Sequence, residues 1–288
     1  MLDIVAAPSG PIALGTDTPA AIRLLPGGSG ANTAAWLSHF GNRVRFAGRV
    51  GRATWTDDAA ELRAHGVEPH LASDGESRTG VLVTLIGPAG ERSFLTDRGA
   101  NARLAHGDLP AALLDGIDHL HVSGYAFVGA GPRAGVRALL DAAQRRGVAF
   151  SVDGGSAAFL RAAGTDVFFG ASHGAAMCFA NADEAAVLTG ETGRAKQAAA
   201  LASRYGAAIV THGPNGACAA AGGEAPITAE PGAPVEALDT SGAGDAFVAG
   251  FLTARLSGAS LEQALRAGIR AGTGAVLHYG GRPPLRAA

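Results

Sequence analysis

The sequence predicts an α/β fold in which a central, mostly parallel sheet is flanked by helices on both faces and carries a small β-sheet lid. From about residue 109 onward, short apolar segments alternate with helical patterns, which is typical of a parallel sheet wrapped by helices. The region before residue 105 instead favours short strands joined by tight turns. We therefore expect residues 1–288 to form a single α/β domain with an inserted accessory sheet.

Strands of the central sheet are expected where apolar runs are short and lie between helical patterns. The four candidates are 119–125, 148–153, 175–181 and 207–213. Helices are expected between them over 132–147 and 194–206. Each helix pattern ends at a glycine, which suits a helix C-terminus.

Strands of the accessory sheet are expected within about 9–26 and 79–98. The segment AAIRLLPGG is one candidate, and the pair TGVLVTLIG and ERSFLTDR, joined by Pro88-Ala89-Gly90, is typical of a hairpin. A flat exposed sheet with apolar residues on its outer face needs a partner or a cover. We interpret these strands as a lid.

Composition limits the function classes. With 288 residues, of which 47% are hydrophobic, the chain can build a full core. A net charge of −2 implies no basic surface for nucleic acid. Cys178 and Cys218 are too few for a disulfide framework or a cysteine metal cluster and are expected to be buried. No apolar run approaches the roughly 20 residues that span a bilayer, and no signal peptide is evident, so we expect a cytoplasmic protein that binds neither nucleic acid nor membrane.

The stretch DTSGAGDAFVAGF, residues 239–251, predicts the start of a helix. Asp239, Thr240 or Ser241 can cap it, with the apolar residues that follow forming its buried stripe. Capping does not explain Gly242 and Gly244, each of which costs up to about 1 kcal/mol relative to alanine in a helical turn. Small residues let backbone N–H groups converge on an anion, and the start of a helix adds partial positive charge at the same place.

Asp245 lies directly after this group of small residues. A carboxylate would repel a bound anion, but it can accept the proton of a hydroxyl group that attacks a phosphoryl group while the N–H groups stabilise the transferred charge. From the spacing alone, a phosphoryl-transfer site and a plain capped helix both remain open.

A second glycine cluster, LPGGSGANTAAWLSHFG, covers residues 25–41. It again places small residues before a helix, with Asn32 near the start of that helix. A tight turn with Asn32 as a cap is the alternative interpretation. Gly28, Gly30 and Thr33 do not complete the dinucleotide fingerprint G-x-G-x-x-G.

Together the two clusters resemble the signatures of the ribokinase-like (PfkB) family of carbohydrate and nucleoside kinases. The second signature is matched from Asp239 to Leu252, and the first by Gly27, Gly28, Asn32, Ala34, Gly41 and Gly51. The resemblance implies the ribokinase-like fold and an ATP-dependent kinase that phosphorylates a hydroxyl group of a sugar or sugar-like acceptor. A nucleoside kinase of the same family and a non-catalytic nucleotide- or sugar-binding regulator are the alternatives.

The resemblance also implies roles for individual residues. Asp245 would be the catalytic base. The backbone of Gly242, Ala243 and Gly244 would form the anion hole. The residues expected to hold the acceptor are Asp3, Gly27, Gly28, Asn32 and Arg98, and those expected to hold the nucleotide are Asn181, Glu184, Thr211, Gly213 and Gly216.

Several of these residues also have a purely structural interpretation. Asn181 and Glu184 match the N-x-x-E motif that the family associates with Mg²⁺, bound by Glu184 through water, but they equally fit a capping box. The segment 211–216 fits both a nucleotide loop and a plain turn. Arg98 could be a solvated charge of the lid. Members of the family also bind a monovalent cation such as K⁺ through the backbone around Asp239 and Ser241, and many pair their lid sheets into a homodimer.

The sequence departs from the family pattern at two places that bear on the site. Relatives carry several apolar residues and a glycine ahead of the equivalent of Leu2-Asp3, so Met1 falls inside the expected first strand. We hypothesise a misassigned start codon, which an intact mass of the native protein that begins at Met1 would contradict.

The segment SVDGGS lacks the asparagine that many relatives have after the equivalent of Asp153, so Asp153 is given no role. Phe46, Phe127 and Tyr125 are the aromatic residues that could form the wall of a nucleoside pocket.

Overall fold

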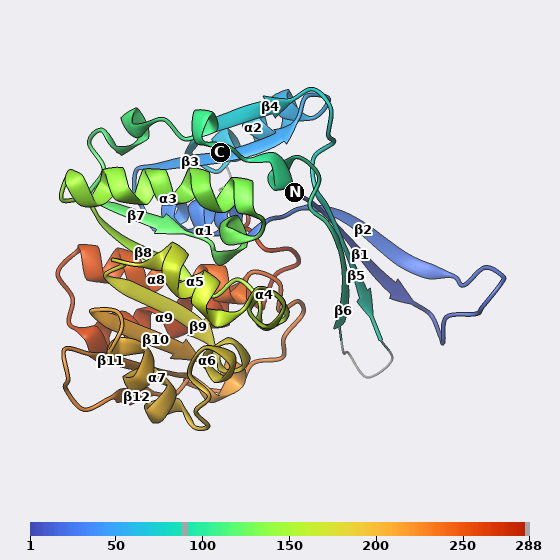
Figure 1. The fold of residues 1–288 in the computed structure, drawn as a ribbon. Helices are drawn as coiled ribbons and strands as arrows, with labels where there is room; N and C mark the ends of the chain where they lie inside the picture. Colours follow the sequence, from blue (N-terminus) through green and yellow to red (C-terminus); the bar gives the residue numbers. More distant parts are fainter. Residues whose placement is uncertain (88–91, 286–288) are drawn as a thin grey trace.

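The body of the molecule is built on a six-stranded sheet of order β12-β11-β10-β9-β8-β7 (Figure 1). The computed structural model describes residues 1–87 and 92–285. The strands are β7 (His119–Val122), β8 (Ala149–Asp153), β9 (Met177–Asn181), β10 (Ala207–Thr211), β11 (Ala217–Ala221) and β12 (Ile227–Ala229). Strands β7 to β10 run parallel, while β11 and β12 are antiparallel to their neighbours. All four predicted strands are confirmed, although β7 ends at Val122 because a short 3-10 helix, Gly124–Phe127, follows it.

Helices cover both faces of this sheet, as expected (Figure 1). Alternate residues of one strand enter different cores, because Cys178 and Ala180 of β9 pack into one cluster and Phe179 into another. The first face is covered by α3 (Ala130–Arg145), α4 (Ala157–Ala163), α5 (Thr165–Ser172), α6 (Ala182–Thr189) and α7 (Arg194–Ala202). The second is covered by α8 (Ala243–Leu256) and α9 (Leu261–Ala275). Cys178 and Cys218 are both buried and unpaired, as predicted.

A second, smaller layer sits beside β7. Strands β3 (Val44–Gly51) and β4 (Val67–Asp74) form a two-stranded parallel sheet, with α2 (Trp55–Ala64) between them in the chain. Helix α1 (Ser29–His39) contributes to two clusters. Its Ala31 and Ala34 pack with Leu62 and Val67 of this layer. On its other side Trp36 packs against α8 and α9, so α1 connects the small layer to the main body.

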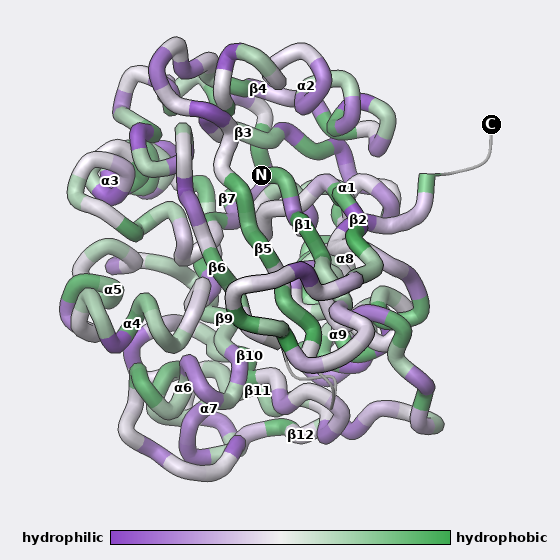
Figure 2. Tube along the Cα trace, turned by 90° about the vertical axis from the view of Figure 1, so that its right-hand side faces the viewer, coloured by the Kyte–Doolittle hydropathy of each residue, from purple (hydrophilic) through white to green (hydrophobic). Residues whose placement is uncertain are grey.

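A four-stranded sheet projects from the body (Figures 1 and 2). Its order is β2-β1-β5-β6, with β1 (Leu2–Pro8), β2 (Ala20–Pro26), β5 (Val81–Ile86) and β6 (Arg92–Asp97). The predicted β5–β6 hairpin is confirmed by its antiparallel register, and the expected turn Pro88-Ala89-Gly90 lies outside the described residues. The lid strands were expected within about 9–26 and 79–98. Leu2–Pro8, the first strand of the chain, also belongs to this sheet, because it pairs along its length with β2 and over Leu2–Ala6 with β5.

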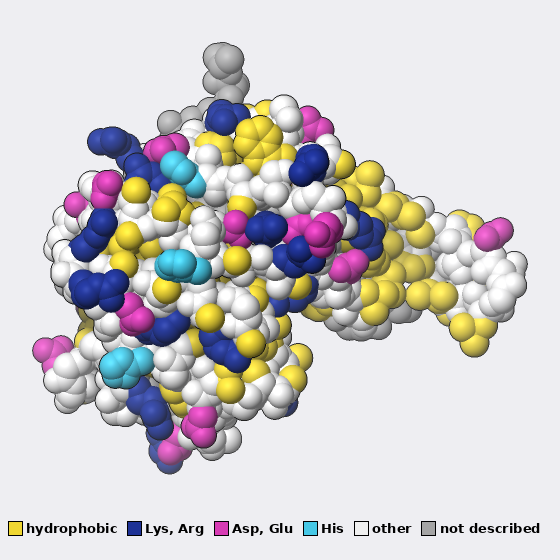
Figure 3. Space-filling model, turned by 45° about the horizontal axis from the view of Figure 1, so that its top comes forward, with side chains coloured by type: hydrophobic (Ala, Val, Ile, Leu, Met, Phe, Trp, Pro, Cys, Tyr) yellow, Lys and Arg dark blue, Asp and Glu magenta, His cyan; other side chains and the backbone are white. Residues whose placement is uncertain are grey.

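The two faces of the projecting sheet differ in character. Strand register places Ile4, Leu24, Val83 and Leu95 on one face. Leu24 and Leu95 are 65% and 60% exposed, and hydrophobic side chains cover much of the projecting part of the surface in Figure 3. Asp3 lies on the opposite face, which turns toward the body. The outer face therefore exposes large apolar side chains, and the carboxylate of Asp3 belongs to the inner face.

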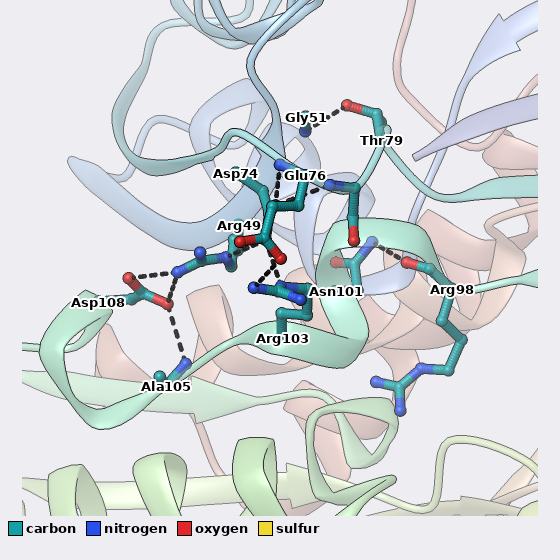
Figure 4. Close-up of polar contacts among 11 residues, drawn as sticks. Arg49, Gly51, Asp74, Glu76, Thr79, Arg98, Asn101, Arg103, Ala105 and Asp108 are labelled. Atoms are coloured by element: carbon teal, nitrogen blue, oxygen red, sulfur yellow. Dashed lines mark hydrogen bonds and ion pairs between the residues drawn. The ribbon is translucent and has the colours of Figure 1, made fainter.

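A polar cluster fixes the segment that leads from β4 into β5 (Figure 4). Asp74 is 2% exposed, and its carboxylate accepts hydrogen bonds from the backbone N–H groups of Glu76 and Ser77 and from Arg49, and pairs with Arg103. The two backbone hydrogen bonds, followed by that from Arg49, hold the pKa of Asp74 well below its usual range. The cluster therefore ties the base of the projecting sheet to β3 and β4.

No helix in the described part of the chain is long and apolar enough to cross a membrane.

Candidate active site

The two glycine-rich segments meet in space. Ser29 and Asn32, in the first turn of α1, both donate hydrogen bonds to the carboxylate of Asp245, in the first turn of α8. The Oγ of Ser29 lies 2.8 Å from Oδ1, and the Nδ2 of Asn32 lies 3.0 Å from Oδ2. The packing of Trp36 against Ala246 and Ala249 holds the two helices together. The predicted base thus lies beside a predicted acceptor residue.

The environment of Asp245 favours proton uptake near neutral pH. Burial raises the pKa of its carboxyl group to about 7, and the negative charges of Asp153 and Asp3 act in the same direction. The hydrogen bonds from Asn32 and Ser29 oppose that rise. A carboxylate with a pKa close to the working pH is suited to act as a general base.

Glycine stands at positions 242 and 244 for different reasons. Gly242 has a φ of 72°, and a Cβ at this position would collide with the backbone of Gly281. Gly244 lies inside the helix and is exposed, and a Cβ there would have no atom of the protein within 4 Å. Packing therefore requires glycine at 242 but not at 244. The absence of a side chain at 244 leaves the start of α8 open, where the first N–H groups of a helix lack intrahelical acceptors.

The expected acceptor residues lie next to this helix start, with the exception of Arg98. A Cβ at Gly27 would overlap the carboxylate of Asp3, so glycine at 27 is what allows Asp3 to approach β2 so closely. Gly28 has a φ of 95° and begins the turn into α1. The Oδ1 of Asp3 is buried and, among the described residues, has no hydrogen-bond partner. Burial raises the pKa of Asp3 to about 6.

Arg282 is a site residue that sequence reasoning missed. Its Nη2 donates to the carbonyl oxygen of Gly27 at 3.1 Å, and its Nε lies 3.4 Å from the Oδ1 of Asn32. The side chain is 8% exposed and forms an ion pair with Glu61. Burial lowers the pKa of Arg282 to about 10. The only signal in the sequence is the glycine pair before it, since a Cβ at Gly281 would collide with Asn32.

Arg98 is engaged elsewhere. Its guanidinium donates to the carbonyl oxygens of Tyr125 and Val128, in and just after the short helix that follows β7, and it points away from the Asp74 cluster in Figure 4. Tyr125 itself is close enough to the site that Glu184, Asp153 and Asp245 add to the effect of burial and raise its pKa to about 12. Arg98 therefore supports the backbone beside the site, and its contact with an acceptor stays a prediction.

Three of the expected nucleotide residues, Asn181, Thr211 and Gly213, line a separate cavity, whereas Glu184 does not. The cavity has a volume of ≈ 310 Å³ and is lined by Asn181, Ala182, Asp183, Thr211, His212, Gly213 and Asn215. That volume lies at the lower end of the range for small-molecule pockets, about 300–1,000 Å³. Gly216 does not line it; its φ of 83° and the nearby carbonyl oxygen of Ala229 show that the turn requires glycine.

Asn181 and Glu184 form the capping box that the sequence allowed. The backbone N–H of Glu184 donates to the Asn181 side chain at 2.9 Å, and the backbone N–H of Asn181 donates to the Glu184 carboxylate at 3.0 Å. The Nδ2 of Asn181 donates to the same carboxylate. Burial raises the pKa of Glu184 to about 7, and the charge of Asp153 contributes.

Three neighbouring carboxylates, those of Asp153, Glu184 and Asp245, fit a magnesium ion held through water. Asp153 raises the pKa of both Glu184 and Asp245, so a divalent cation among these three groups would relieve their mutual repulsion. No group of three acidic, histidine or cysteine side chains in the described ranges is arranged to hold a metal directly. Mg²⁺ commonly keeps several waters and binds through one or two carboxylates and the phosphates of a substrate.

Asp239 organises the loop before α8. Its carboxylate accepts from the backbone N–H of Ser241 at 2.8 Å and from that of Gly280 at 3.0 Å, and the residue is 4% exposed. The side chain therefore connects this loop to the segment after α9. A monovalent cation at this place would depend on backbone carbonyl groups, as the resemblance implies.

Comparisons with known proteins agree with this architecture. A family model described as pfkB family carbohydrate kinase matches residues 1–288. A fructokinase of Klebsiella pneumoniae is 30% identical over 242 residues, which cover 79% of this chain and 76% of the relative. A 1-phosphofructokinase of Rhodobacter capsulatus is 30% identical over 282 residues, 92% of this chain and 84% of the relative.

Solved structures share the fold. The adenosine kinase of Sinorhizobium meliloti has a TM-score of 0.86 and 23% sequence identity, and the match covers 98% of this chain and 93% of that structure. The predicted ribokinase-like fold class is thereby confirmed. Because the family model spans the whole chain, this protein belongs to the pfkB family of carbohydrate kinases, the family of ATP-dependent kinases that its two glycine-rich signatures predict.

Proposed function

We propose that this protein transfers the γ-phosphoryl group of ATP to a hydroxyl group of a sugar or sugar-like acceptor. The observation that carries the proposal is the position of Asp245. Its carboxylate, with a pKa of about 7, lies in the first turn of α8 and is bonded to Asn32 of the acceptor segment. A base, a helix start and an acceptor residue therefore share one small volume.

In this mechanism Asp245 takes the proton of the acceptor hydroxyl as its oxygen attacks the γ-phosphorus. The backbone of Gly242, Ala243 and Gly244 faces the charge that develops on the transferred group. Mg²⁺, when bound, would neutralise charge on the phosphates, with Glu184 and Asn181 holding it through water. Thr211 and Gly213, which line the cavity, would contact the nucleotide.

The acceptor side is suited to a polyol. Asp3 presents a buried carboxylate oxygen without a partner among the described residues, and a hydroxyl group is the donor that such an oxygen needs. Asn32 offers both a donor and an acceptor. Gly27 lets Asp3 lie against it and Gly28 leaves room beside them. Arg98 would act on the acceptor only through a change of its present contacts.

A nucleoside acceptor is the alternative within the same family. Of the three aromatic residues considered, Phe127 is 0% exposed and packs in the core, whereas Tyr125 is 44% exposed and lies near the three carboxylates. Tyr125 could therefore stack on a base. The second alternative, a regulator without catalysis, would leave the arrangement of Asp245 with Asn32 and Ser29 unexplained.

We propose further that residues 1–288 act as one unit, in which the projecting sheet is a lid over the acceptor. Asp3 supports this, because a lid strand carries a carboxylate to the site. The exposed apolar outer face of the same sheet supports a homodimer formed through the lids. Activation by K⁺ through the backbone around Asp239 and Ser241 belongs to the same proposal.

The test is release of ADP with Mg²⁺ and K⁺ across a panel of acceptors. The panel contains ribose, fructose, fructose phosphates, 2-keto-3-deoxygluconate, adenosine and other nucleosides. We expect one sugar-type acceptor to give turnover that Asp245→Asn loses, while the exposed control Asp141→Asn keeps it. Turnover only with nucleosides would select the alternative. Binding of ATP without turnover on any acceptor would favour a regulator, and replacement of K⁺ by Na⁺ tests the cation.

A further inference from the structure

We propose that His212 binds the nucleotide, with its side chain donating a hydrogen bond to a phosphate oxygen of ATP. The inference rests on the proposed function, because it places the nucleotide in the cavity at the carboxyl ends of β9 and β10. His212 lies outside both glycine-rich signatures and outside the capping box. It stands between Thr211 and Gly213, two of the residues that are expected to hold the nucleotide.

The backbone of the turn after β10 fixes the position of His212. Its N–H donates to the carbonyl oxygen of Gly216 at 2.8 Å, and its own carbonyl oxygen accepts from the N–H of Asn215 at 3.0 Å. Both hydrogen bonds close the turn that contains the short 3-10 helix Gly213–Asn215. His212 is therefore held at the wall of the cavity, which it lines.

The side chain of His212 lacks a hydrogen-bond partner that its chemistry requires. Its Nε2 is buried and has no partner among residues 1–87 and 92–285. A buried polar atom without a partner costs folding free energy, and a ligand that supplies the partner removes that cost. Rotation about χ2, which is broad and roughly two-fold for histidine, is the motion by which this nitrogen would meet a bound nucleotide.

The imidazole of His212 is suited to donate without carrying a charge. Burial, followed by the positive charge of Arg194, lowers the pKa of His212. The ring is therefore neutral at neutral pH, and a neutral imidazole carries one N–H donor and one acceptor. A phosphate oxygen is an acceptor only, so the N–H group is the part of the ring that would contact it.

The lining of the cavity favours the phosphate groups of a nucleotide over its base. Apart from His212, the lining residues are small or polar. A purine stacks on large apolar or aromatic surfaces, which these residues do not offer. The base would therefore lie outside this cavity and the phosphates within it.

Charge favours the His212 side of the cavity for an anion. Asp183, in the first turn of α6, brings a negative charge to the part of the wall that follows β9. In the part that follows β10, the positive charge of Arg194 lies close enough to lower the pKa of His212. Arg194 pairs with Glu230 at 3.2 Å, but the Glu230 side chain is 66% exposed, so water screens its opposing charge. A phosphate is therefore drawn toward His212.

A purely structural role for His212 is the competing explanation, and binding and stability measured on the same variants separate the two. Calorimetry with Mg²⁺ and ATP gives Kd, and thermal unfolding without nucleotide gives Tm. We expect His212→Leu to raise Kd for ATP roughly 10- to 100-fold, because it loses a hydrogen bond to a charged group. Its Tm without nucleotide should equal or exceed that of the unmodified protein, since the nitrogen it removes has no partner there. His212→Gln, which keeps an N–H donor, should bind ATP nearly as tightly as the unmodified protein.

Nucleotide analogues show which group His212 contacts. GTP and 2′-deoxy-ATP keep the phosphates of ATP, so His212→Leu should raise their Kd by the same factor. A loss that disappears with 2′-deoxy-ATP would assign the contact to the ribose, and one that disappears with GTP would assign it to the base. Either result would overturn the phosphate contact. Steady-state kinetics should show a raised KM for ATP and an unchanged KM for the acceptor.

Two further variants complete the test. His173→Leu is the matched control, because His173 is exposed and lies between α5 and the amino end of β9, whereas the cavity lies at the carboxyl end of that strand. It should leave Kd for ATP unchanged. If His212→Leu does not fold, His212→Ala should show the same rise in Kd.

Two results would overturn the inference in different ways. An unchanged Kd in a folded His212→Leu or His212→Ala protein, with or without a fall in Tm, would overturn the contact while the unmodified protein still binds ATP. Absence of ATP binding to the unmodified protein would overturn the proposed function and this inference together.

Discussion

Asn32 and Asp245, 213 positions apart in the chain, are joined by a hydrogen bond of 3.0 Å between the amide nitrogen and a carboxylate oxygen. Each residue belongs to one of the two glycine-rich segments, and each lies in the first turn of a helix. The contact between α1 and α8 therefore fixes the position of the acceptor segment relative to the base without a ligand. The geometry that the proposed proton transfer needs is a property of the helix packing.

The raised pKa of Asp245 predicts opposite effects of pH on stability and activity. Because the folded-state pKa of about 7 lies above the ordinary value of 3.8 for an aspartate side chain, ionisation of this carboxyl opposes folding. The resulting cost in folding free energy is absent at pH values below the ordinary pKa, grows between the two pKa values and is complete above the folded-state pKa. Asp245→Asn should therefore raise Tm more at about pH 8 than at about pH 5, while kcat falls on the order of 10² to 10⁴. Thermal unfolding at the two pH values measures the change in Tm. ATP titrations in a kinetic assay measure the fall in kcat.

The same pKa sets the rate profile of the unmodified protein. We expect kcat/KM for the acceptor to rise as pH increases through about 7, since only the ionised carboxylate accepts a proton. Asp141→Asn, at an exposed carboxylate, should leave the pH dependence of both kcat/KM and Tm unchanged. An equal change of Tm at the two pH values would show that Asp245 does not have a raised pKa.

The parts of the fold that were predictable from sequence are those whose residues carry a local signal. Strands such as β10 are short apolar runs, and both faces of β10 are buried, so the pattern alone predicts a central strand. Leu2–Pro8 is equally apolar, yet it joins the projecting sheet. Periodicity identifies a strand but does not identify the sheet to which it belongs, because pairing depends on distant partners.

The residues of the candidate site also fall into two groups, those with a local signal in the sequence and those without one. Gly242, Gly244 and Asp245 could be singled out because glycines that capping does not explain are unusual at the start of a helix. Arg282 and Ser123 could not be found from spacing, since their contacts with Asn32 and Ser29 span 250 and 94 positions. Those contacts exist only because α1 is packed between the two regions. Sequence thus indicated the candidate residues of the site but not the residues that support them.

Gly242 and Gly244 offer a paired test of the anion hole. Gly242→Ala places a Cβ against Gly281 at a φ of 72°, so we expect a clear loss of stability, by roughly 1–3 kcal/mol. Gly244→Ala meets no neighbouring atom and should leave the free energy of unfolding unchanged or raise it by up to about 1 kcal/mol. If the backbone here binds the transferred phosphoryl group, Gly244→Ala will nevertheless lower kcat. Full activity in that stable variant would argue against an anion hole at this position.

Replacement of Arg282 should weaken binding of the acceptor and leave binding of the nucleotide unchanged. Arg282→Met removes the donors to Asn32 and to the Gly27 carbonyl, and hydrogen bonds from charged groups contribute about 1.5–3 kcal/mol. We therefore expect KM for the acceptor to rise roughly 10- to 100-fold, with KM for ATP unchanged. Steady-state kinetics with each substrate varied in turn measures the difference. Arg266→Met, at an exposed arginine paired with Glu262 on α9, is the control, and equal changes in both KM values would contradict a role specific to the acceptor.

The outer face of the lid predicts an oligomer that charge can dissociate. Leu24 and Leu95 are 65% and 60% exposed on the face turned away from the body, and contiguous apolar surface of this kind marks an interface. Light scattering after gel filtration should give twice the monomer mass for the unmodified protein and the monomer mass for a Leu24→Lys, Leu95→Lys variant. Leu256→Lys, at a 49% exposed leucine on the last turn of α8, should leave the dimer intact. Because Asp3 lies on the opposite face of the same sheet, dissociation should also loosen the acceptor site and raise KM for the acceptor. A monomer mass for the unmodified protein would contradict the interface and leave the lid as a cover for its own subunit alone.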